Sequence, residues 1–320
     1  MDQENRQGRK SLHMGKKHGL LFELNKNKIM FLMLLPTLIF FLINSYVPMV
    51  GIYYAFTSYD FAGGLFGSPF VGLNNFKFLV QSGMLTKLTV NTISYNIVFI
   101  VFGNAMAIFA AILLNEISGK VFKKLTQSLM FLPYFVSFVI LSVLSYNMFN
   151  FETGFFNSTL RSFGFNAVDV YNTPWLWTIL IPLFYIWKNL GYSMVIYLAS
   201  ITGISEEYYE AARIDGANKF QQIWHITVPM LKPTFVILLL FALGSIMKGQ
   251  FDLFYQLIGN NGMLFNATDI IDTYVYRSLK VNFDVGMATA AGLYQSLFGF
   301  TLILVVNYII KKINDDYALF

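Results

Sequence analysis

Long apolar runs alternate with short polar segments along nearly the whole chain. A membrane-spanning helix needs about 20 mostly apolar residues, and six segments reach that length. The segments are 29–57, 88–114, 125–148, 174–201, 233–258 and 284–310. This pattern predicts an all-α membrane protein with six transmembrane helices in one domain (29–310). A basic leader (1–28) precedes the domain, and a short tail (311–320) follows it.

One long polar segment, 205–232, interrupts the apolar pattern between the fourth and fifth predicted spans. Ser205 is suited to cap a helix whose first turn carries two glutamates, which favour the positive end of the helix dipole. Gly216 permits a sharp turn because it has no side chain. Asp215 is placed to cap a second helix, which is expected to stop near Pro229. We therefore predict a helix-turn-helix lying flat against one membrane face.

The composition supports a membrane protein and excludes several chemistries. Hydrophobic residues make up 56% of the chain and charged residues 12%, about half the charge of a typical soluble domain. The absence of cysteine excludes disulfides, thiolate catalysis and a cysteine-based metal site. The histidines, His13, His18 and His225, are too far apart in sequence for a shared helical metal site. We expect no metal and no cofactor bound by this chain.

The basic residues are distributed unevenly between the two sides of the predicted membrane domain. One side has 7 Lys and Arg in residues 1–28, 3 in 115–124, 3 in 202–232 and 2 in 311–320, against 5 in the loops on the other side. Because Lys and Arg favour the cytoplasmic side, both termini and the polar segment are predicted to be cytoplasmic. The basic leader then favours contact with lipid headgroups rather than with nucleic acid.

The polar segment contains Glu210-Ala211-Ala212-Arg213-Ile214-Asp215-Gly216-Ala217, followed by Phe220, Ile223, Ile226 and Val228-Pro229. Further motifs are Trp187-Lys188-Asn189-Leu190-Gly191-Tyr192, Tyr197-Leu198-Ala199, Asp269 to Arg277, and Gly292-Leu293-Tyr294-Gln295-Ser296. Together they resemble the binding-protein-dependent ABC importer permeases, whose EAA loop the first motif matches. The later motifs resemble the branch that imports oligosaccharides and polysaccharide fragments, the LplB type of Gram-positive bacteria. The resemblance covers about residues 25–315; Ser205 stands where proline is commonest.

The resemblance implies a fold, a mechanism and partners. The fold would be that of a type I ABC importer permease in the bacterial cell membrane. The EAA loop would be a coupling helix docked in a groove of a cytoplasmic ATPase. The implied partners are two such ATPase subunits carrying ATP and Mg, a second EAA-type permease forming a heterodimer, and an extracellular sugar-binding protein or lipoprotein. The implied coupling residues are Glu210, Ala211, Ala212, Asp215, Gly216 and Ala217. The chain itself has no GxxxxGK[ST] phosphate loop, so we expect no enzymatic activity.

Polar side chains within the spans are candidates for a substrate path. Tyr185, Lys188 and Tyr192 fall on one helical face of the fourth span, beside Asn189. In the maltose permease subunit, which the chain resembles here, this part of the helix contacts sugar, and the adjacent fifth span suggests Lys248 and Gln250. A lysine hints at an acidic sugar. Equally, Lys188 could pair with Asp252, a carboxylate in the fifth span.

Other polar and small residues in the spans favour helix packing. Polar residues expected to join helices are Asn96, Asn104, Asn147, Tyr294 and Gln295. The small residues of the sixth span suit close helix packing, or alternatively a pore or subunit contact. An ion-coupled secondary transporter of a small solute is the alternative function, but no internal repeat is visible. An intramembrane enzyme lacks HExxH and GxSxG motifs.

Overall fold

The computed structural model describes residues 26–313 of the chain. The described part is helical apart from connecting loops and one isolated antiparallel bridge between Thr57 and Phe70. Most of the predicted leader (1–25) and most of the predicted tail (314–320) lie outside the described residues. The chain divides into two units, residues 1–52 and 53–320.

The first unit contains one long apolar helix. Helix α2 (Lys28–Phe41) continues as a π-helical segment (Leu42–Tyr46) and then as a 3-10 segment (Val47–Phe56), whose last residues belong to the second unit. Together they make a continuous stretch of 29 residues. This length is enough to cross a membrane, and it lies where the first span was predicted.

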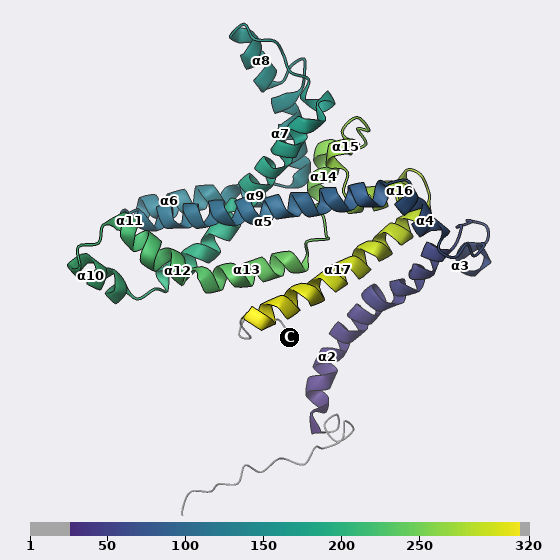
Figure 1. Ribbon diagram of the computed structural model, residues 1–320, viewed down its shortest axis with the longest axis horizontal. Helices are drawn as coiled ribbons and strands as arrows, with labels where there is room; N and C mark the ends of the chain where they lie inside the picture. Colours follow the sequence, from purple (N-terminus) through teal and green to yellow (C-terminus); the bar gives the residue numbers. More distant parts are fainter. Residues whose placement is uncertain (1–25, 314–320) are drawn as a thin grey trace, which may run out of the picture. The chain divides into compact units, whose positions relative to one another are not determined.

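The second unit is built around two long helices that pack along each other, α5 (Met84–Glu116) and α9 (Pro174–Thr202) (Figure 1). A third long helix, α17 (Val285–Ile313), packs against α16 (Ile271–Lys280). Each of the three long helices contains an apolar window long enough to cross a membrane, and each lies where a span was predicted. Helix α5 contributes residues to all three buried hydrophobic clusters of this unit, so it is the central helix.

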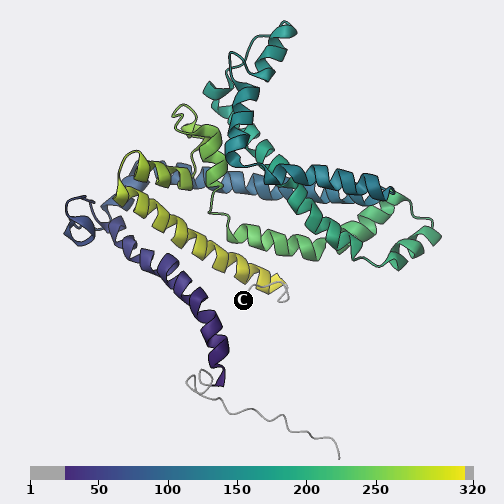
Figure 2. The ribbon, with the colours of Figure 1, turned by 180° about the vertical axis from the view of Figure 1, so that it is seen from behind.

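The third predicted span is sharply bent. Helix α6 (Lys120–Phe131) and the 3-10 segment that follows it (Leu132–Phe135) meet α7 (Phe138–Phe149) at an angle of 96°. Both views show α7, with α8 beyond it, projecting away from α5 (Figures 1 and 2). The prediction of a continuous helix over 125–148 is therefore wrong: residues 136 and 137 are not helical, and the chain bends there. Pro133, which lacks a backbone N–H, lies in the 3-10 segment just before the bend.

The fifth predicted span is broken. Helix α13 (Lys232–Gly244) ends at Gly244, and α14 (Phe251–Ile258) starts after six residues that are not in a helix. We call residues 245–250 the fifth-span break; in Figure 1 they form the thin green connection between the two helices. The prediction of one helix over 233–258 is wrong. Instead, α13 continues the helical segment Lys219–Met230 across a bend of 51°.

The remaining elements are short. They are α3 (Gly64–Gly67), α4 (Asn74–Gln81), α8 (Phe155–Ser162), a 3-10 turn (Val170–Asn172), α10 (Glu206–Ile214), α11 (Lys219–Gln222), a π-helical segment (Ile223–Thr227), α12 (Val228–Met230) and α15 (Phe265–Thr268).

Small residues let helices approach closely at two places. On α17, Ala288, Ala290 and Ala291 are buried, which favours packing within the chain over a pore-lining role. On α9, Gly191 lies against the bent third span: an added Cβ would be 2.5 Å from Phe131 Cα and closer still to Met130 O.

We expect Gly191→Ala to destabilise the protein by about 1–3 kcal/mol, because the new methyl group overlaps backbone atoms that cannot move aside singly. The measurement is thermal unfolding of the purified protein in detergent. Gly292→Ala is the matched control, since a Cβ at Gly292 on α17 would have nothing within 4 Å. Equal unfolding temperatures for the two variants would contradict the close approach of α9 to the bend.

Candidate functional site

A cavity of about 430 Å³ lies between α5, α9, α13 and the fifth-span break. Of the residues predicted to line a substrate path, the structure brings together at this cavity Tyr185, Asn189, Tyr192, Lys248 and Gln250. The first three come from successive turns of α9, and the last two come from the break. Lys188 is absent from the lining. The cavity thus joins side chains that are about 60 positions apart in sequence.

Aromatic rings on α9 are held in place by other aromatic rings. Tyr185 stacks on Phe99 of α5, with ring centroids 4.0 Å apart and planes 16° from parallel. Tyr192 stacks on Tyr134 at 5.0 Å. Asn189 Nδ2 donates a hydrogen bond to Tyr185 O at 2.9 Å. Fixed rings beside an amide group suit a ligand that has both apolar faces and hydroxyl groups.

Lys248 is exposed at the cavity, and its positive charge interacts electrostatically with the carboxylate of Asp272, which lies outside the spans. Asp272 of α16 accepts hydrogen bonds through Oδ2 from Gly249 N at 2.7 Å and from Gln295 Nε2 at 3.1 Å. Burial raises the pKa of the Asp272 carboxyl, while these hydrogen bonds and the positive charge of Lys248 act to lower it. The cavity therefore has a cation at its wall and a carboxylate behind that wall.

Lys188 has a different role from either of the two that its sequence position suggested. Its Nζ donates hydrogen bonds to the backbone oxygens of Tyr134, at 2.8 Å, and of Val136. The ammonium also lies 4.9 Å from the centre of the Phe138 ring. The residue is 7% exposed. Lys188 thus satisfies carbonyl groups that the 96° bend removes from helical hydrogen bonding, and it is bonded there rather than to Asp252.

Sequence reasoning assigned Asn96 and Gln295 to helix packing and missed their connection to the cavity. Asn96 Nδ2 donates to Ile246 O at 3.0 Å and to Lys248 O at 3.2 Å, and Gln295 Nε2 donates to Met247 O at 2.6 Å. Both residues therefore hold the fifth-span break. No sequence signal could identify this, because the break itself was not predicted. Asn104, also assigned to packing, accepts a bond from Tyr197 OH at 2.6 Å.

The polar segment forms the predicted helix-turn-helix. Ser205 Oγ accepts a hydrogen bond from Glu207 N at 3.4 Å at the start of α10, as predicted for a cap. Gly216 has φ +82°, a left-handed conformation that favours glycine. Nothing lies within 4 Å of a Cβ built at Gly216, so backbone conformation within this chain, rather than crowding, requires the glycine.

The cap of the second helix differs from the prediction. Asn218 caps α11 in a reciprocal arrangement: its side chain accepts from Gln221 N at 2.9 Å, and the Gln221 side chain accepts from Asn218 N at 2.8 Å. Asp215 instead ends α10. The helix also passes through Pro229, because the π-helical segment before it changes the bonding pattern, so the expected stop at Pro229 is wrong.

The turn leaves a hollow of about 330 Å³, lined in part by Ala212, Asp215, Gly216 and Ala217. Glu210 lies on the exposed face of α10, with its side chain 62% exposed and 3.9 Å from Arg213. Neighbouring apolar side chains are also exposed: Ile214 is 86% exposed and Phe220 73%. An open hollow, with exposed apolar side chains on the two helices that form it, suits contact with another protein.

The polar segment is tied to the long helices. Lys219 Nζ lies 2.9 Å from Glu116 Oε2 at the end of α5. Tyr209 OH and Thr227 Oγ1 are hydrogen-bonded at 2.9 Å, which joins α10 to the helix leading into α13. Movement of the helix-turn-helix is therefore linked mechanically to α5 and α13, two of the helices that border the cavity.

Comparison with known proteins identifies similar transport proteins. Residues 103–315 match the family described as "Binding-protein-dependent transport system inner membrane component". The chain is 34% identical to the polygalacturonan/rhamnogalacturonan transport system permease protein YteP of Bacillus subtilis, over 94% of this chain and 93% of that protein. It is 32% identical to protein LplB of the same organism, over 95% of each chain.

A solved structure shares the fold. The chain in the crystal structure of a bacterial alginate ABC transporter, in complex with an alginate pentasaccharide-bound periplasmic protein, superposes with a TM-score of 0.82 at 31% sequence identity. The match covers 92% of this chain and 98% of that one. The fold is therefore that of an ABC importer permease.

We expect Lys188→Met to lower the free energy of unfolding by about 1–3 kcal/mol, because two backbone carbonyl groups at the bend lose the hydrogen-bond donor that Lys188 supplies. Thermal unfolding in detergent measures this. Lys248→Met is the control: it removes the same charge from an exposed position at the cavity and should leave the unfolding temperature nearly unchanged. An unaltered unfolding temperature for Lys188→Met would show that the bend does not need this lysine.

Proposed function

The chain belongs to the family of binding-protein-dependent transport system inner membrane components, and from that membership we propose that it carries acidic oligosaccharides through the cavity between α5, α9 and the fifth-span break. The observation that carries the proposal is the convergence of Tyr185, Asn189, Tyr192, Lys248 and Gln250 on one cavity. Stacked rings suit sugar faces, and amide groups suit hydroxyls. The family membership also excludes the alternative function, an ion-coupled secondary transporter.

Two observations support an acidic cargo. Lys248 lines the cavity with an exposed ammonium, which would pair with a uronate carboxylate. In addition, one relative is named for polygalacturonan/rhamnogalacturonan transport, and a similar solved structure is described as importing the acidic polysaccharide alginate. Lys188 does not contribute, since its Nζ is bonded to backbone carbonyls. The acidic preference therefore depends on Lys248.

Energy would reach the cavity from partner subunits. In this proposal Glu210, Ala211, Ala212, Asp215, Gly216 and Ala217 form a coupling helix that docks on a cytoplasmic ATPase. The exposed Glu210 carboxylate would pair with a basic group of the ATPase, and the hollow at Gly216 would receive part of that subunit. The ties from Lys219 to Glu116 and from Tyr209 to Thr227 would pass the motion to the helices around the cavity.

The full transporter in this proposal contains two permeases, two ATPases and an external sugar-binding protein. A second EAA-type permease would form a heterodimer with this chain, and ATP and Mg would bind to the ATPase subunits alone. Both termini and the polar segment would face the cytoplasm, as the distribution of Lys and Arg favours. Cargo would arrive from the opposite side, delivered by the binding protein.

We expect Lys248→Met to reduce uptake of oligogalacturonate at least about tenfold, because an unpaired carboxylate in a membrane cavity is costly. Lys248→Arg should retain most uptake, since it keeps the charge. Uptake of labelled oligosaccharide into proteoliposomes containing the assembled transporter measures both. If the Met variant transports oligogalacturonate as well as the parent does, the acidic cargo assignment fails.

Gly216→Asp and Glu210→Lys should each abolish uptake and substrate-stimulated ATP hydrolysis while leaving the protein in the membrane. Gly216→Asp places a side chain in the hollow and strains a left-handed residue by about 1–2 kcal/mol. Glu210→Lys reverses the docking charge. Gly203→Asp and Glu207→Lys are the matched controls, because they make the same changes outside the coupling residues. Normal uptake in both test variants would contradict the coupling role.

A further inference from the structure

The fifth-span break exposes backbone groups that a continuous helix would have bonded internally. Inside a membrane such groups need other partners. They receive them from side chains of three different helices: Asn96 of α5 bonds Ile246 O and Lys248 O, Gln295 of α17 bonds Met247 O, and Asp272 of α16 bonds Gly249 N. The break is therefore held in one defined conformation.

Asp272 is the junction of this arrangement. One oxygen, Oδ2, accepts hydrogen bonds from both Gly249 N and Gln295 Nε2, so the carboxylate joins the break to α17. The approach is close: a Cβ built at Gly249 would lie 2.7 Å from Asp272 Oδ2 and closer still to Ile270 Cδ1. Only glycine allows this contact, and its two sequence neighbours are the cavity residues Lys248 and Gln250.

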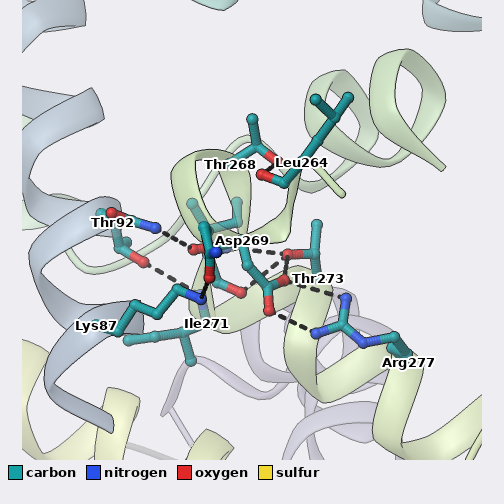
Figure 3. A network of polar contacts seen from close by, with 11 residues as sticks. Lys87, Thr92, Leu264, Thr268, Asp269, Ile271, Thr273 and Arg277 are labelled. Carbon is teal, nitrogen blue, oxygen red and sulfur yellow. Dashed lines mark hydrogen bonds and ion pairs between the residues drawn. The ribbon is translucent and has the colours of Figure 1, made fainter. Parts of the chain in front are cut away.

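A second polar network holds α16, and hence Asp272, against α5. Figure 3 shows the Asp269 carboxylate hydrogen-bonded to both Thr273 and Arg277, with Arg277 Nη1 3.2 Å from Asp269 Oδ1. Ile271 N donates to Thr92 Oγ1 at 3.1 Å, and Asn91 Nδ2 donates to Asp269 O at 3.0 Å. Asp272 therefore approaches the break from a helix whose first turn is itself anchored.

We propose that Asp272 is a positioning residue of the transport cavity: by accepting hydrogen bonds from Gly249 and Gln295, it holds the fifth-span break so that Lys248 and Gln250 face the cargo. This inference rests on the proposed function of the cavity. The residue acts through the break, because its accepting oxygen is bonded to the backbone of Gly249 and the side chain of Gln295, and Asp272 does not line the cavity.

The shared oxygen makes a sharp substitution series possible. In Asp272→Asn the amide oxygen can still accept both hydrogen bonds, whereas Asp272→Ala accepts neither. A positioning role predicts that Asn retains function and Ala loses it. A role as counter-charge to Lys248 alone predicts that the two variants fail alike. Gln295→Met provides an independent test, since it removes the side chain that donates hydrogen bonds to Asp272 Oδ2 and Met247 O.

The test uses cysteine labelling in the complete transporter in membrane vesicles. The chain has no cysteine, so Gln250→Cys introduces its only thiol. The rate at which this thiol reacts with a water-soluble maleimide reports on the exposure of residue 250 in the break. Asp272→Ala and Gln295→Met each remove one side-chain hydrogen bond to the break, at Gly249 N and at Met247 O respectively. We expect each to raise the labelling rate of Gln250→Cys about three- to tenfold, the shift expected from losing one such bond. Asp272→Asn should leave the rate within about twofold of the parent.

Controls separate local positioning from general unfolding. Ser162→Cys, at an exposed position on α8, should label at the same rate in every background. Asp252→Asn removes an exposed carboxylate from the first turn of α14 and should not change labelling at Gln250→Cys. Should the Ala variant be lost from the membrane, the rates for Asp272→Asn and Gln295→Met still decide the question.

The outcomes for the inference and for the proposed function are distinct. Equal labelling rates in the Asp272→Ala, Asp272→Asn and parent backgrounds overturn the positioning role, as do equal increases in the Ala and Asn variants. We expect oligogalacturonate or alginate oligosaccharide to protect Gln250→Cys from labelling, and maltotriose not to protect it. If neither acidic oligosaccharide protects, the proposed cargo site fails, and the role of Asp272 in the break is judged from the labelling rates alone.

Discussion

Inside a membrane every backbone polar group must find a hydrogen-bond partner, because lipid offers none. This constraint organises the structure around its two interrupted spans. At the bend of the third span, Lys188 of α9 bonds the free carbonyl groups. At the break of the fifth span, side chains of α5, α16 and α17 share the task. Intact helices thus supply the polar groups that make irregular backbone possible, and the cavity forms beside the irregular backbone.

The same helices connect the cavity to the polar segment. Helix α5 lines the cavity through Phe99 and ends at Glu116, which pairs with Lys219 of the helix-turn-helix. Helix α13 follows the second helix of the helix-turn-helix along the chain and ends at the break. A displacement of the polar segment would therefore act on the wall of the cavity through rigid helices. This arrangement is the one that the proposed coupling to a partner ATPase requires.

Much of the candidate site could be predicted from residue type and helical spacing. Tyr185, Asn189 and Tyr192 fall on α9 facing the cavity, because their spacing needs only a helix to bring them together. Lys188 shows the limit of that reasoning. It shares the periodicity, but its long side chain reaches the carbonyls of a bend that hydropathy could not reveal. Asp215 and Asn218 show another limit: both can cap a helix, and the actual start of α11 selected Asn218.

By itself the sequence determined the class of protein: its apolar runs require helices in a membrane, its basic residues favour one orientation, and its Glu210–Ala217 motif carries the family resemblance. These properties depend on residues close together in the chain, so they can be read locally. Only the tertiary structure decided that the fifth span breaks at residues 245–250 and that Asn96, Asp272 and Gln295 hold it. Those contacts join helices that are far apart in sequence, so no local pattern of residues reveals them.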